Sequence, residues 1–201
     1  ASSLSGGTPR RVTAVVLPDT GSRYNHPVRP DAIERNIRGV GSGAKKVAIV
    51  VVLEEPGYAT AAALAVSRAM PGPSWRSRRK AATRYQLVFV DPTGKDVEVD
   101  DDLKVIIDAQ RTAAELVDTP PTDLNPATFG ARALELFADL KNVEVESIVG
   151  EELVELGLGG IYGVGKAAVE APRMIVATYT PEEASGKRVA LVGKGVCYDT
   201  G

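Results

Sequence analysis

The chain has 201 residues, a length that allows one large or two small domains. Its hydrophobic content of 44% and charged content of 25% are ordinary for a globular protein. The formal net charge of −2 argues against a nucleic-acid surface, which is usually basic. The sequence shows neither an apolar run near the roughly 18 residues of a membrane span nor a visible signal peptide. We therefore expect no nucleic-acid or membrane partner.

The chain contains one cysteine, Cys197, and one histidine, His26. A single cysteine excludes an internal disulfide framework and is typical of a reducing compartment, so we expect a cytoplasmic protein. A single histidine excludes a histidine-rich metal site within this chain. We expect His26 to be an ordinary loop residue and Cys197 to be a small apolar residue at a strand end, because neither has a suitable partner nearby in sequence.

Residues 1–10 are mostly small and polar and predict a disordered tail. The segment 11–100 alternates apolar runs with helical patterns and predicts an N-terminal α/β domain. Its run KVAIVVVL, 46–53, is almost continuously β-branched, as in a strand buried on both faces. We expect further strands at 11–17, 85–90 and 97–99, the last two as a hairpin, and helices at 30–40 and 58–70.

Residues 101–118 have the longest helical pattern and predict a linker helix, whose first acids favour the helix dipole. The proline-rich DTPPTDLNP follows, so we place a boundary near 118 and expect a second domain at 119–201. The expected elements of this domain are helices at 127–140 and 150–156, a glycine-rich loop at 157–165, and strands at 143–149, 173–179 and 188–192. The alternation predicts an α/β fold with largely parallel sheets. The last strand is so apolar that we expect neighbours on both sides of it, and hence an incomplete second domain.

Three polar or glycine-rich motifs have simpler interpretations than a binding site. The run GGIYGVGKA, 159–167, nearly matches the phosphate-binding loop G-x-x-x-x-G-K-[ST]. Ala167 cannot supply the hydroxyl that holds magnesium, and the run does not follow a strand, so we expect a tight loop. The basic run 76–80 is short and predicts a solvated loop. The acids at 100–102, with Glu98 nearby, lack the spacing of a calcium loop and predict charges at a helix start.

The last stretch of the chain, LVGKGVCYDTG, contains a more specific pair. Lys194 follows the predicted strand between two glycines, Gly193 and Gly195, and Asp199 comes five residues later. In open α/β sheets, functional groups gather at the carboxyl ends of central strands. A partly buried lysine and a carboxylate there can bind a cation, but an ordinary Lys–Asp ion pair has the same spacing. The spacing leaves both interpretations open.

The segment VGKGVCYDTG resembles the first metal-binding signature of the leucyl (cytosol) aminopeptidase family. Three more stretches agree with that family in order. VDTPPTDLNPATF resembles the start of its catalytic domain, and GLGGIYGVGKAAVEAPRMIVATY resembles its glycine loop and following strand. The strand 47–53 and the Ala-rich helix after it resemble its N-terminal domain. The resemblance covers roughly 45–201, is strongest from 117 onward, and is closest to the aminopeptidase-like branch of the family.

The resemblance implies a macro-like N-terminal α/β domain followed by the start of a mixed-sheet α/β/α catalytic domain. It implies a hexameric enzyme that uses two divalent ions, zinc, manganese or magnesium, to remove N-terminal residues from peptides. Lys194 and Asp199 match two metal ligands, and Gly193 and Gly195 shape the loop around them.

No residue of this chain matches a catalytic position. By the resemblance, the catalytic lysine, the further acids and a bicarbonate-binding arginine would come after Gly201. We therefore expect the isolated chain to be inactive and to need a downstream segment or a companion chain. The alternative is a non-catalytic structural subunit derived from the same family.

Overall fold

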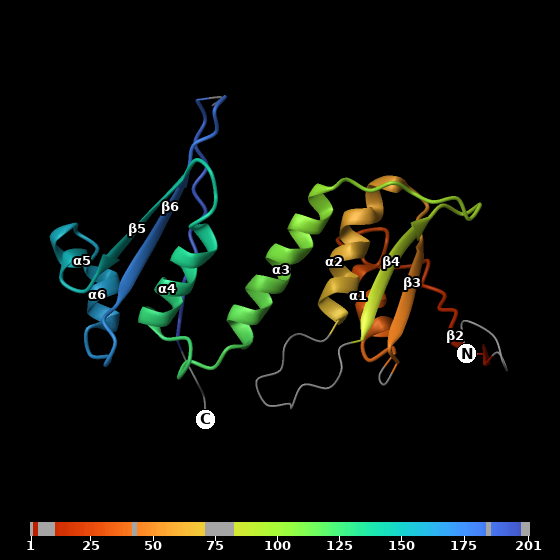
Figure 1. Cartoon of the computed structure of the whole chain (residues 1–201), viewed down its shortest axis with the longest axis horizontal. Helices are drawn as coiled ribbons and strands as arrows, with labels where there is room; N and C mark the ends of the chain where they lie inside the picture. Colours follow the sequence, from red (N-terminus) through yellow and green to blue (C-terminus); the bar gives the residue numbers. More distant parts are fainter. Residues whose placement is uncertain (1, 4–10, 42–43, 71–82, 184–185, 198–201) are drawn as a thin grey trace. The chain divides into compact units, whose positions relative to one another are not determined.

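The computed structural model describes residues 2–3, 11–41, 44–70, 83–183 and 186–197. The chain divides into two compact units, Ala1–Leu116 and Val117–Gly201. The fold is α/β, as predicted, with small parallel and antiparallel sheets (Figure 1). None of the helices in the described part of the chain is long and apolar enough to cross a membrane.

The first unit is built on two parallel strands, β3 (Lys46–Val52) and β4 (Arg84–Val90), paired along their whole length. A 3₁₀ turn, η1 (Pro56–Tyr58), leads from β3 into α2 (Ala59–Ala69). The alanines of α2 pack against Ile49, Val51 and Phe89. These buried residues form the core of this unit.

Burial in β3 alternates, so the prediction of a strand buried on both faces is wrong. Ile49 and Val51 are buried, whereas Val50 and Val52 are each 59% exposed. The β-branched composition predicted a strand correctly. In the described residues a helix covers only one of its faces.

Two helices complete the described core of the first unit. The helix α1 (Pro30–Ile37) packs against α2 and buries Ala32 and Ile33. The helix α3 (Asp102–Asp118) places Leu103 in the same core, and Ile107 packs against that core.

Two strand predictions in this unit are wrong in extent. The strand expected at 11–17 is limited to β2 (Arg11–Val12), which pairs with β1 (Ser2–Ser3). The expected hairpin with 97–99 is reduced to a single bridge between Val90 and Asp96. Asp91 caps the intervening turn by accepting hydrogen bonds from the backbone N–H groups of Thr93 and Lys95.

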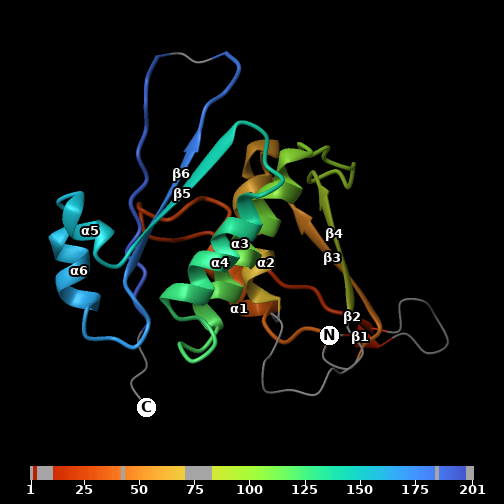
Figure 2. The same ribbon diagram turned by 60° about the vertical axis from the view of Figure 1, so that its left-hand side comes forward.

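The second unit contains an antiparallel pair, β5 (Val143–Val149) and β6 (Arg173–Tyr179), at the residues predicted. The expectation of largely parallel sheets is wrong for this pair. The helix α4 (Pro126–Phe137) lies along these two strands (Figure 2). Two short helices, α5 (Glu152–Glu155) and α6 (Gly159–Gly165), connect β5 to β6.

Two further predictions for the second unit are wrong. The stretch predicted as a glycine-rich loop, 157–165, contains the helix α6, in which the Lys166 N–H donates to the Tyr162 carbonyl. The strand predicted at 188–192 does not form, and Leu191 is 96% exposed. Its composition favours burial, but a strand requires backbone partners, and no described strand pairs with it.

Candidate functional site

Lys194 lies in the described segment 186–197, which has neither helix nor strand. Its side chain is exposed, so the expectation of a partly buried lysine is wrong. The reason is the missing strand, because without pairing the segment does not enter a core. Asp199, the second predicted ligand, lies outside the described residues, so the structure does not relate it to Lys194.

Gly195, next to Lys194, lies against the aromatic ring of Phe129. A Cβ placed on Gly195 would be 3.3 Å from Cε1 of Phe129, closer than an ordinary carbon contact. A Cβ on Gly193 would meet nothing within 4 Å. The two glycines beside Lys194 therefore differ, because only Gly195 is required to be small by a neighbouring side chain.

Phe129 belongs to the first turn of α4, which has a well-formed N-terminal cap. The Asn125 side chain accepts hydrogen bonds from the backbone N–H groups of Ala127 and Thr128, each at 3.0 Å. The Thr128 hydroxyl accepts one from the Asn125 N–H at 2.9 Å, and Pro126 occupies the first helical position. This capping box fixes the start of α4. The capped start of α4 thus holds the Phe129 ring against Gly195. The two residues belong to two different stretches that resemble the family, NPATF and VGKG.

A second close contact in this unit joins α4 to β6, and sequence reasoning did not find it. A Cβ on the buried Gly130 would lie 2.6 Å from Cδ and from Nη1 of Arg173. Nε of Arg173 is buried and has no hydrogen-bond partner among the described residues. Position 130 has no room for a Cβ, because the Arg173 side chain passes over the helix there.

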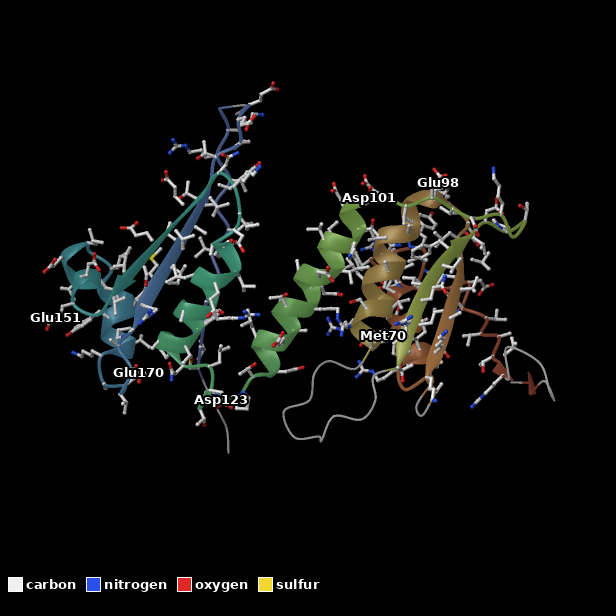
Figure 3. All side chains as sticks on the ribbon, in the orientation of Figure 1. Met70, Glu98, Asp101, Asp123, Glu151 and Glu170 are labelled. Atoms are coloured by element: carbon white, nitrogen blue, oxygen red, sulfur yellow. The ribbon has the colours of Figure 1, made fainter. Side chains whose placement is uncertain are left out.

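Two of the candidates that the sequence analysis set aside have ordinary structural roles. Nδ1 of His26 accepts a hydrogen bond from the Val28 N–H, and its ring meets Tyr58 edge to face. Asp100 accepts a hydrogen bond from the Asp102 N–H at the start of α3, as expected of helix-start charges. Asp101 lies at the same helix start (Figure 3).

The remaining candidates do not add a site. Cys197 is a free, exposed cysteine and does not end a strand, so the prediction of a strand-end residue is wrong. The stretch that nearly matched a phosphate loop is helical and lacks the loop form that phosphate binding requires. The basic run 76–80 lies outside the described residues.

The described residues do not form a metal site on their own. They contain no group of three or more His, Cys, Asp or Glu side chains that could hold an ion. The Lys194 amine is exposed and open to a metal ion, but no such group lies in the described part of the chain to complete a site around it. The donor set within this part of the chain is therefore too small for a divalent ion.

Comparison with known proteins identifies the family. The family model described as "Cytosol aminopeptidase family, catalytic domain" matches residues 111–201. A second model, described as "M17 aminopeptidase N-terminal domain 2", matches residues 8–78. The chain belongs to the cytosol aminopeptidase family. The resemblance found in the sequence is therefore confirmed, and the family's catalytic-domain match includes both Lys194 and Asp199.

Individual members of the family agree with this assignment. A probable aminopeptidase of Homo sapiens is 37% identical over 196 residues, which are 94% of this chain and 37% of that protein. A probable cytosol aminopeptidase of Rhodococcus opacus is 34% identical and is matched over 34% of its length by 85% of this chain. The crystal structure of an M17 aminopeptidase from Trypanosoma brucei has a TM-score of 0.73 and 31% identity, over 85% of this chain and 34% of that one. The chain thus spans about a third of the length of these family members.

Proposed function

We propose that this chain is part of a metal-dependent aminopeptidase that removes N-terminal residues from peptides, and that Lys194 and Asp199 are two of its metal ligands. The observation that carries the proposal is the family's catalytic-domain match, which runs through both residues. Because the chain spans about a third of its relatives' length, the remaining ligands are proposed to come from residues outside these 201.

The local structure supports a ligand role for Lys194 in two ways. The amine is exposed, so an ion or another segment of protein can reach it. The next residue, Gly195, packs on Phe129, which restricts where the segment can lie on the second unit. When bound, a pair of divalent ions in such a centre activates water and polarises a carbonyl group. This chain would supply two ligands to that centre, the amine of Lys194 and the carboxylate of Asp199.

The finer properties implied by the resemblance belong to the same proposal. The ions would be zinc, manganese or magnesium, with bicarbonate bound by an arginine outside this chain. The active form would be a hexamer in the cytoplasm. The isolated chain would be inactive because it lacks most of the ligands.

Hydrolysis of a leucine anilide tests this proposal. The 201-residue chain should show no metal-stimulated hydrolysis. A longer polypeptide, in which the rest of the family's catalytic domain follows Gly201, should hydrolyse the anilide when manganese or zinc is added. An inactive but folded and metal-loaded longer protein would contradict the proposal.

The second candidate is a non-catalytic structural subunit derived from the same family, since this chain by itself holds only two of the proposed ligands, Lys194 and Asp199. That candidate predicts a longer protein that assembles but neither binds ions nor hydrolyses peptides.

A further inference from the structure

The outer face of the β3–β4 sheet is apolar, and no helix in the described part of the chain covers it. The helices α1 and α2 lie on the other side of the two strands, where the core is (Figure 1). Side chains alternate along a strand, so the parallel register places four valines on the outer face: Val50, Val52, Val88 and Val90. Val50 and Val52 are each 59% exposed, which leaves apolar surface open to solvent.

The two ends of this outer face carry opposite charges. Lys46 and Arg84 are paired in register where the two strands begin, on the same face as the valines, and both are exposed. Glu54 lies just beyond the carboxyl end of β3 and is also exposed. Asp96 adds a second exposed acid beside the end of β4, which Lys95 in the same turn partly offsets. The face thus runs from a basic end, across an apolar middle, to an end where acids predominate.

A face with this pattern is complementary to a second copy of itself. We propose that two copies of the chain pack their outer β3–β4 faces together, related by a two-fold axis that crosses the strands at Val50. The strands of the two copies then run antiparallel. Lys46 lies as far before Val50 as Glu54 lies after it, so the lysine of each copy faces the glutamate of the other. A parallel arrangement opposes like charges and is therefore disfavoured.

The size of this face sets the expected strength of the pairing. Two strands offer a small contact area, and interfaces at the small end of the range are weak and transient. We expect a dissociation constant on the order of 0.1 mM. The valines supply most of the buried surface, and the charged ends select the partner and its orientation. The pairing concerns the first unit and does not depend on the proposed peptidase activity.

Sedimentation equilibrium of the 201-residue chain, from about 10 μM to about 1 mM, tests the proposal. The chain should pass from monomer to dimer across this range. The amide signals of β3 and β4 should move with concentration in ¹H–¹⁵N NMR spectra. A chain that remains monomeric at about 1 mM would overturn the proposal, because the outer face would then be left to a partner other than a second copy.

Charge reversal tests the antiparallel arrangement. The variant Lys46→Glu/Arg84→Glu makes both ends of the face acidic. The variant Glu54→Lys/Asp96→Lys makes both ends basic. Each variant alone should dimerise at least about tenfold more weakly than the wild type, because like charges then meet. An equimolar mixture of the two should recover most of the wild-type affinity, because each end then meets the opposite charge.

Two results of the charge-reversal experiment would overturn the proposal. One is wild-type affinity in both separate variants, since the charged ends would then not meet. The other is a mixture that associates no better than either variant alone.

Val50→Lys tests the apolar middle of the face. It brings two ammonium groups together near the two-fold axis and should abolish the dimer at about 1 mM. Val164→Lys is the matched control, because Val164 is 89% exposed in α6 of the second unit, and it should leave the dimer unchanged. The amide spectrum of each variant checks that it is folded. A dimer that persists in folded Val50→Lys would place the contact on another surface and overturn the proposal, and the mixing experiment decides the matter if Val50→Lys does not fold.

Discussion

Gly195 and the ring of Phe129 are in contact, with only 3.3 Å between the position of a Cβ at Gly195 and Cε1 of Phe129. The contact joins the segment that carries Lys194 to the capped start of α4. It gives the glycine after the lysine a packing role, whereas the glycine before it has free space around it.

Gly195→Ala should disturb this contact. The added methyl group requires the ring to move by a few tenths of an ångström, and overpacking of this kind costs on the order of 1 kcal/mol. The ring signals of Phe129 should shift in NMR spectra of the variant. Gly193→Ala is the control and should leave those signals in place, because a Cβ there meets nothing within 4 Å. Equal shifts in both variants would mean that the contact does not exist in solution.

Asn125→Ala should destabilise the second unit by about 1 kcal/mol, the usual cost of losing a helix N-cap. Two backbone N–H groups, those of Ala127 and Thr128, lose their acceptor in this variant. Chemical denaturation followed by circular dichroism measures the loss. Asn125→Asp keeps an acceptor oxygen and should retain most of the stability. A loss as large in Asn125→Asp as in Asn125→Ala would argue against the cap.

Gly130→Ala should cost about 1–3 kcal/mol, because its methyl group would overlap the Arg173 side chain, 2.6 Å from Cδ. A double-mutant cycle with Arg173→Ala separates this overlap from other effects, and the double variant should be little less stable than Arg173→Ala alone. Gly163→Ala, in α6 with nothing within 4 Å of its Cβ, is the helical control. It should be neutral or stabilising by up to about 1 kcal/mol.

Asp91 gives a prediction on pH. A hydrogen bond from the Thr93 hydroxyl, helped by the Lys95 N–H, lowers the pKa of Asp91 from its ordinary 3.8. Because the pKa of Asp91 is lower in the folded state than in the unfolded state, ionised Asp91 stabilises the fold at pH values above its unfolded-state pKa. This stabilisation is lost as the pH falls through its folded-state pKa. Thr93→Ala should therefore raise the pKa of Asp91 and reduce stability near neutral pH, with a smaller difference in acid. Carboxyl NMR titration measures the pKa, and Thr93→Ser should keep it low.

Elements whose stability is local were predictable from the sequence. The alternation VEVESIV, typical of a half-buried strand, predicted β5 at its observed residues, and the apolar run RMIVATY, typical of a strand, predicted β6 at its observed residues. The direction of their pairing did not follow, because α/β alternation suggested parallel strands while α5 and α6 connect an antiparallel pair.

Features that depend on distant partners were not predictable. The apolar run 188–192 has a strand composition but no described neighbour, and it stays exposed. The glycines at 159–165 suggested a loop, whereas the residues between them complete a helix. The contacts of Phe129 with Gly195 and of Gly130 with Arg173 join residues more than forty positions apart, and neither pair carries a pattern in the sequence. The sequence identified Lys194 as a candidate metal ligand through the family resemblance. It predicted a partly buried side chain, however, whereas the side chain is exposed.

The most direct test of the account is the metal content of a longer polypeptide in which the rest of the family's catalytic domain follows these 201 residues. After dialysis against manganese or zinc, elemental analysis should find two ions per chain in the wild type. Lys194→Ala and Asp199→Asn should each reduce that number or the affinity, while Lys187→Ala, in the same exposed segment, should change neither. Full metal content with unchanged affinity in both Lys194→Ala and Asp199→Asn would contradict their assignment as ligands.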